Sequence, residues 1–179
     1  MTDYIHSVLG EFDSSNAHLQ IQRPKQQISN RETGASRPFT SDVPDLVSVH
    51  GTLTPSDFVT EGASLLVSFK TGPPFPGTTA FTWIITDENG RIRVSSPRGP
   101  GLGSSSSEFP VPIEVEDYAT GEVKEIPWEW EDWQVPLGYQ AKNIAKLYDL
   151  YYEGRGEAFG VCDFESASKR HRQIDGLLW

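Results

Sequence analysis

At 179 residues the chain can bury a core without disulfide or metal staples, so it lies outside the class of very small stapled domains. Only 36% of its residues are hydrophobic and thirteen are proline, and the chain holds five Trp, nine Phe and six Tyr. This composition favours a β-rich fold with irregular connections over a helical bundle. The net charge is −10, and most of the negative excess lies in residues 108–139, which contain nine acidic residues and one lysine. This concentration of negative charge disfavours nucleic-acid binding.

Cys162 is the single cysteine, so an internal disulfide framework is excluded. The first fifteen residues lack a basic start followed by an apolar run, and no stretch approaches the roughly 18 apolar residues of a membrane helix. We therefore expect a chain inside a cell or a virion, without membrane contact.

Residues 1–45 predict a polar arm that begins with a short helix. The apolar side chains of that helix are spaced as one face of two turns: Tyr4, Ile5, Val8, Leu9 and Phe12. The rest is rich in Gln and broken by Pro24, Pro38 and Pro44. Two alternatives stay open, a flexible arm and an arm that becomes ordered against another subunit.

Residues 46–136 predict a β domain. Alternating apolar residues mark strands in 46–53 and 63–69, and 79–96 is typical of a hairpin. Asn89-Gly90 favours a type I′ turn that pairs Ile85 with Val94 and Thr86 with Arg93. The apolar residues then share one face: Phe81, Trp83, Ile85, Ile92 and Val94.

After a flexible connection at 98–107, Pro110 and Pro112 interrupt an alternating run and indicate an edge strand over 109–115. A short return strand follows at 122–126. About six strands with turn signals between them predict a small antiparallel β-sandwich, and the sequence does not separate an immunoglobulin-like from a jelly-roll topology.

Residues 137–179 predict a helical C-terminal extension. In the first helix the apolar residues recur at helical spacing, namely Ile144, Leu147, Tyr148 and Tyr151, and Gly154 ends it. A second helix is expected from Asp163 to Ile174, with the basic run 169–172 in its last turn.

The acidic segment carries three tryptophans, Trp128, Trp130 and Trp133, beside Glu129, Glu131 and Asp132. These rings either cover the edge of the sandwich, or anchor a protein partner, or stack a sugar. Covering the edge is the simplest reading, since the carboxylates between the rings would then face water.

The sequence predicts no catalytic, cofactor or metal site. The glycine-rich stretches 99–103 and 154–160 lack the strand and helix context of a phosphate loop. His6, His18, His50 and His171 have no metal-ligand spacing with one another or with Cys162. A catalytic pair of Cys162 and His171 has no motif behind it.

The overall design leads to a function hypothesis. We expect a noncatalytic structural or assembly protein, specifically a component of a viral or phage particle, that docks on copies of itself or on neighbouring subunits. The expected contact residues outside the acidic segment lie near the two ends: Tyr4, Ile5, Leu9, Phe12, Leu177, Leu178 and Trp179. An acidic inhibitor that imitates nucleic acid is the alternative, and a carbohydrate-binding module using the three tryptophans is a weaker one.

Overall fold

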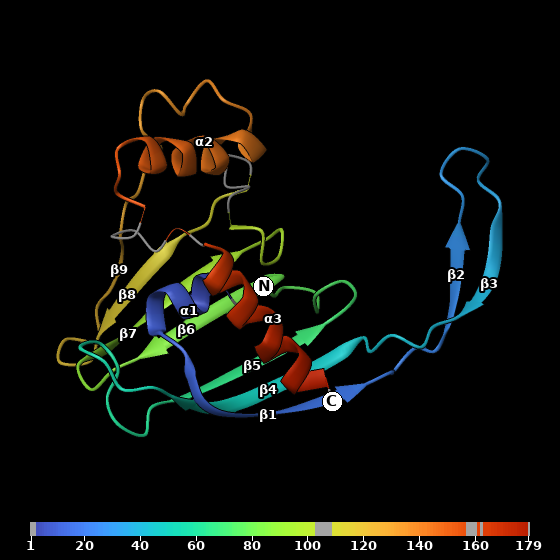
Figure 1. Cartoon of the computed structure of the whole chain (residues 1–179), viewed down its shortest axis with the longest axis horizontal. Helices are drawn as coiled ribbons and strands as arrows, with labels where there is room; N and C mark the ends of the chain where they lie inside the picture. The colour runs from blue at the N-terminus through green and yellow to red at the C-terminus, as the bar shows by residue number, and fades with distance from the viewer. Residues whose placement is uncertain (1–2, 103–108, 157–160, 162, 179) are drawn as a thin grey trace. The chain divides into compact units, whose positions relative to one another are not determined.

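The computed structural model describes residues 3–102, 109–156, 161 and 163–178. The chain divides into two compact units, unit 1 (1–72 with 162–179) and unit 2 (73–161). The fold is mainly β with several antiparallel sheets and two helices near the C-terminus, as the sequence predicts. The elements are α1 (Asp3–Leu9), β1 (Phe12–Gln20), β2 (Lys25–Ser29), β3 (Ser36–Thr40), β4 (Leu46–Leu53), β5 (Ser64–Lys70), β6 (Phe81–Thr86), β7 (Gly90–Ser96), β8 (Ile113–Asp117), β9 (Val123–Glu125), α2 (Tyr139–Tyr152) and α3 (Phe164–Leu178) (Figure 1).

Unit 1 is built on a three-stranded antiparallel sheet in the order β1-β4-β5. Its core face holds Val49, Leu53 and Leu65, which are all buried, and α3 packs near β1. Strand β1 lies in the segment that the sequence predicts to be an arm, so that prediction is wrong for these residues. Ala17 and Leu19 pair with Val49 and Val47 and add to the core face. The strand therefore needs few apolar residues of its own.

The rest of the expected arm forms a two-stranded ribbon, β2 paired with β3, that extends beyond the ends of β1 and β4 (Figure 1). At its base, Asp45 is only 5% exposed. Its carboxylate accepts hydrogen bonds from Gln22 N at 2.6 Å and from Arg23 N and Nε at 3.2 and 3.0 Å. The chain therefore leaves and re-enters the sheet at one fixed point.

Helix α3 is the last element of unit 1. Asp163 caps its start by accepting a hydrogen bond from Ser166 N at 2.7 Å, as the sequence predicts. The helix runs on to Leu178, so the basic run 169–172 lies inside it and not in the last turn. This position lets Arg170 make two bonds of 3.0 Å to Glu11, which joins α3 to the start of β1.

Unit 2 is built on a four-stranded antiparallel sheet in the order β6-β7-β8-β9. The predicted apolar face is confirmed, because Trp83 pairs with Val94 and Ile85 with Ile92. The predicted turn is wrong by one position and the predicted pairing by two, since Thr86 pairs with Arg91 and not with Arg93. Asp87 N bonds to Gly90 O at 2.9 Å, so Glu88 and Asn89 form the loop. No described residue other than glycine has a positive φ, and Gly90 is not among the glycines that do, so the turn is not type I′.

The prediction of an edge strand over 109–115 is wrong, because β8 lies inside the sheet and not at its edge. Strand β8 begins at Ile113, after both prolines, and pairs with β7 on one side and β9 on the other. Because the prolines lie before the strand, they remove no hydrogen bond from its ladder. Position 90 requires glycine, because a Cβ atom there would overlap the carbonyl oxygen of Glu116.

Candidate functional site

The three tryptophans lie in the segment between β9 and α2, here called the Trp segment (126–138). Trp128 donates a hydrogen bond from Nε1 to Val111 O at 2.9 Å, and the residue is 38% exposed. Trp128 and Trp130 meet edge to face at a centroid distance of 5.4 Å and an angle of 77°. The two rings therefore do not form the flat platform that sugar stacking requires.

Helix α2 is joined to the Trp segment by polar contacts. Lys146 Nζ lies 2.6 Å from Glu131 Oε1 and 3.2 Å from Asp149 Oδ2. Trp133 donates from Nε1 to Glu131 Oε2 at 2.7 Å, and Lys146 lies 6.0 Å from the centre of the Trp133 ring. Lys142 lies 5.0 Å from the centre of the Trp130 ring.

These contacts shift the pKa values of the ion pair in the directions that stabilise both charges. Hydrogen bonds from Lys146 and then from Trp133 lower the pKa of Glu131. The hydrogen bond to Glu131 raises the pKa of Lys146. The pair is charged at neutral pH and holds α2 in a defined orientation.

A buried glutamine completes the join. Gln134 is only 4% exposed. Its Nε2 donates to Lys142 O at 3.1 Å, and its Oε1 accepts from Glu131 N at 3.1 Å. One end of this side chain thus binds α2 and the other end binds within the Trp segment.

The consequence is that α2 turns its apolar side outward. Lys142, Lys146 and Leu150 follow each other at four-residue spacing on the inner side, and Leu150 is 5% exposed. The opposite side carries large exposed residues, here called the α2 stripe: Ile144 (55%), Leu147 (48%), Tyr148 (72%), Tyr151 (80%) and Tyr152 (89%). An amphipathic helix normally presents the reverse arrangement.

The acidic residues expected to contact a partner have mixed surroundings. Glu129 and Asp132 are exposed, while Glu131 is bound to Lys146. Two further carboxylates, outside the Trp segment, are also paired: Glu114 bonds to Arg93 at 2.7 and 2.8 Å, and Glu116 is paired with Arg91. A surface whose carboxylates are neutralised in this way is a poor imitation of nucleic acid.

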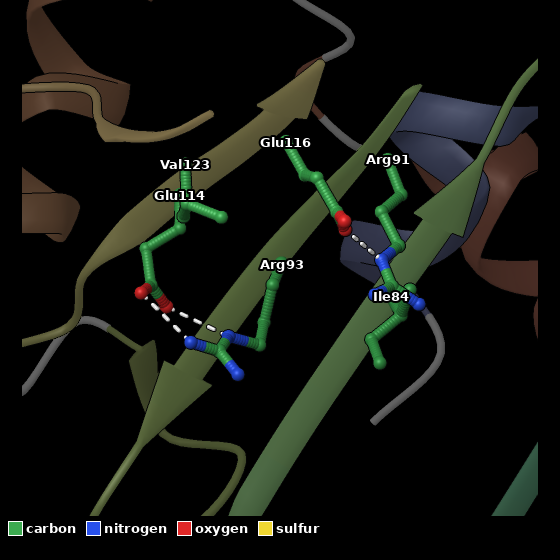
Figure 2. Close-up of a pocket in the computed structure, with 6 residues that line it drawn as sticks. All are labelled: Ile84, Arg91, Arg93, Glu114, Glu116 and Val123. Carbon is green, nitrogen blue, oxygen red and sulfur yellow. Dashed lines mark hydrogen bonds and ion pairs between the residues drawn. The ribbon is translucent and has the colours of Figure 1, made fainter. Parts of the chain in front are cut away.

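These cross-strand pairs line a groove of about 310 Å³ on the outer face of the sheet in unit 2, and Figure 2 shows them side by side. Ile84 and Val123 complete the lining. The hydrogen bond to each carboxylate raises the pKa of Arg91 and of Arg93, and the bond from Arg93 lowers that of Glu114. Because opposite charges face each other across β7 and β8, the groove has little net charge to attract a ligand.

The contact residues expected near the chain ends lie in unit 1. Ile5 is 5% exposed, and Tyr4, Leu9, Phe12 and Leu177 are half-buried. The Phe12 ring lies 5.3 Å from that of His6. The side chain of Leu178 and all of Trp179 fall outside the described residues.

A polar cluster beside these residues was missed by the sequence reading. Glu11 Oε2 lies 3.7 Å from His6 Nδ1, which lies 2.8 Å from Gly10 O. Burial raises the pKa of Glu11, but the hydrogen bond and charge of Arg170 outweigh it, with His6 and Lys169 adding, and the net shift is downward. No sequence signal could have found a pair 159 residues apart.

Within the described part of the chain, no group of three or more His, Cys, Asp or Glu side chains could hold a metal ion. Cys162 lies outside that part, so the prediction that it has no catalytic role stays a prediction. No helix among the described residues is long and apolar enough to cross a membrane.

No family model matches the chain, and no curated protein matches its sequence. Among solved structures, it resembles the crystal structure of the super-repressor mutant of Gal80p from Saccharomyces cerevisiae, with 18% identity and a TM-score of 0.68. The match covers 98% of this chain and 44% of that chain, so this chain spans less than half the length of its structural neighbour. At this identity the likeness shows the fold alone.

This likeness overturns the function hypothesis drawn from the sequence. The fold is shared with a repressor, and the expectation of a structural component of a viral or phage particle is wrong. That expectation rested on the prediction that residues 1–45 form an arm without packed structure of its own. Residues 12–20 of this segment instead form β1 in the core sheet of unit 1.

Proposed function

We propose that this chain is a noncatalytic protein-binding part of a regulatory protein, and that the α2 stripe is its binding surface. The observation that carries the proposal is the orientation of α2. Its lysines contact Trp130, Trp133 and Glu131, while three tyrosines are 72–89% exposed. Side chains of this size and exposure, gathered on one helix face, are typical of a surface that a partner covers.

The composition of the stripe supports a protein partner. Tyrosine supplies a large contact area with few rotatable bonds, and its hydroxyl keeps a polar atom for the partner or for water. Ile144 and Leu147 provide the apolar centre. The fold that this chain shares with a repressor supports a regulatory role. The β-sandwich expected from the sequence stays a prediction.

Site-specific crosslinking tests the proposal. A photoreactive phenylalanine analogue is placed at Tyr148 or Tyr151, and in a control chain at Phe58, which is 89% exposed but lies in unit 1. A protein crosslinked from 148 and 151 but not from 58 is then purified, and its affinity is measured directly.

The double variant Tyr148→Ser, Tyr151→Ser should weaken this affinity at least about tenfold, because central interface aromatics dominate binding energy. The matched control Phe58→Ser, Phe75→Ser removes two rings that are at least as exposed on average, at 89% and 78%, and should leave the affinity unchanged. Equal loss in both double variants, or no crosslinked protein at 148 and 151, would overturn the proposal.

A further inference from the structure

The β2–β3 ribbon is a second surface that the proposed function does not use. Every residue of both strands is exposed, and the register places Gln26, Ile28, Arg37 and Phe39 on one face. Ile28 and Phe39 are 42% and 41% exposed. An isolated two-stranded hairpin is only marginally stable in water and gains stability from a third strand or a packed face.

The ribbon is nevertheless held in shape at both of its ends. At the base, Arg23 is bonded to Asp45 and to Thr71 O, and Ser41 N bonds to Pro24 O at 2.7 Å. At the tip, Asn30 Oδ1 accepts hydrogen bonds from Glu32 N and Thr33 N at 2.8 and 3.0 Å. A preformed ribbon loses less conformational entropy on binding than a disordered arm would.

The ribbon differs in charge from the rest of the molecule. Residues 24–41 contain three basic residues and one acidic residue, a net charge of +2, so the rest of the chain carries −12, and Arg23 at the base is paired with Asp45. Lys25, Arg31 and Arg37 are exposed. Electrostatic attraction thus directs the ribbon toward an acidic surface.

Unit 2 offers such a surface, here called the acidic edge (122–132). It contains five acidic residues and one lysine, and two of the carboxylates are in ion pairs, Glu122 with Lys124 and Glu131 with Lys146. Exposed apolar side chains alternate with them: Val123 (56%), Ile126 (44%) and Trp128 (38%). Within the described sheet, β9 pairs only with β8, so the outer side of β9 has main-chain groups open to another strand.

We infer that the β2–β3 ribbon of one copy of this chain docks along the acidic edge of a second copy. The occupant is a second copy because charge, exposed apolar residues and an open strand edge are complementary between two surfaces of the same chain. When two copies exchange ribbons reciprocally, each gives one ribbon and receives one, and the assembly is a closed two-fold dimer; a ribbon given to a third copy would produce a larger assembly instead. Added strands of this kind bind through main-chain hydrogen bonds, and the side chains give specificity.

Sedimentation velocity on the full chain at low and high salt tests the dimer. The wild-type chain should dimerise at low salt, and its dissociation constant should rise at least about tenfold between 0.05 and 0.5 M salt. A monomer at every concentration up to about 0.2 mM would overturn the inference. So would association that tightens with salt, because ribbons that pair with each other, both positive, would behave in that way.

Charge exchange provides the specific test. Arg31→Glu with Arg37→Glu brings the net charge of the ribbon from +2 to −2, and Glu125→Lys, Glu129→Lys and Asp132→Lys together bring that of the acidic edge from −4 to +2. Each variant alone should be monomeric, and an equal mixture should dimerise again, since the reversed ribbon then meets the reversed edge and the unchanged ribbon meets the unchanged edge. Lys70→Glu with Arg172→Glu is the control and should leave the wild-type dimer intact.

All five reversed residues are exposed, so thermal unfolding of each variant should match the wild type. A mixture that stays monomeric while both variants remain folded would refute the inference. The crosslinking experiment on the α2 stripe reads a different surface, so either result stands without the other.

Discussion

The orientation of α2 predicts opposite outcomes for two leucines three residues apart. Leu150 is 5% exposed and Leu147 is 48% exposed. Leu150→Ala removes buried methyl groups and leaves a cavity, and should lower the free energy of unfolding by about 2–5 kcal/mol. Leu147 has about half of its surface in water, so Leu147→Ala should cost about 1 kcal/mol, half of the value for full burial.

Urea denaturation followed by tryptophan fluorescence provides the measurement, because Trp128, Trp130 and Trp133 lie beside α2. The midpoint should fall markedly for Leu150→Ala and slightly for Leu147→Ala, with the same denaturant slope in both. A larger loss for Leu147→Ala would show that the stripe is the packed side of the helix. The reasoning behind the proposed function would then be refuted.

Three further outcomes are expected. Hydrogen bonds from Lys146 and Trp133 lower the pKa of Glu131, so the pair stabilises the fold above the ordinary Glu pKa of about 4.3 and is lost as the pH falls through the lowered pKa. Glu131→Gln should remove this part of the acid dependence in pH-dependent unfolding, and an unchanged profile would contradict it. Arg170→Met breaks two bonds to Glu11 and should cost about 1–3 kcal/mol in thermal or urea unfolding, whereas the exposed control Arg172→Met should cost far less. Gly90→Ala should cost about 1–3 kcal/mol because its Cβ would meet Glu116 O, while Gly176→Ala, which meets nothing within 4 Å and lies in α3, should stabilise by up to about 1 kcal/mol; equal effects would argue against the strand register.

The sequence alone determined the local elements, because their signals act over a few residues. Alternation placed the strands of 46–53 and 63–69 and the shared apolar face of the hairpin over 79–96. The helical spacing and Gly154, whose φ is +68°, placed α2 and its end. Side-chain periodicity and glycine's access to positive φ are properties of the chain itself, so they can be read without knowing the neighbours.

Tertiary structure decided which surfaces are covered, because burial depends on partners that are distant in sequence. The pattern of β1 is too weak to stand alone, and pairing with β4 makes it a core strand. The stripe of Ile144, Leu147, Tyr148 and Tyr151 indicates an amphipathic helix, but only the contacts of Lys142 and Lys146 with the Trp segment show that this stripe faces outward. Hydrophobic periodicity gives the period of a helix and not its direction, which the surrounding side chains fix.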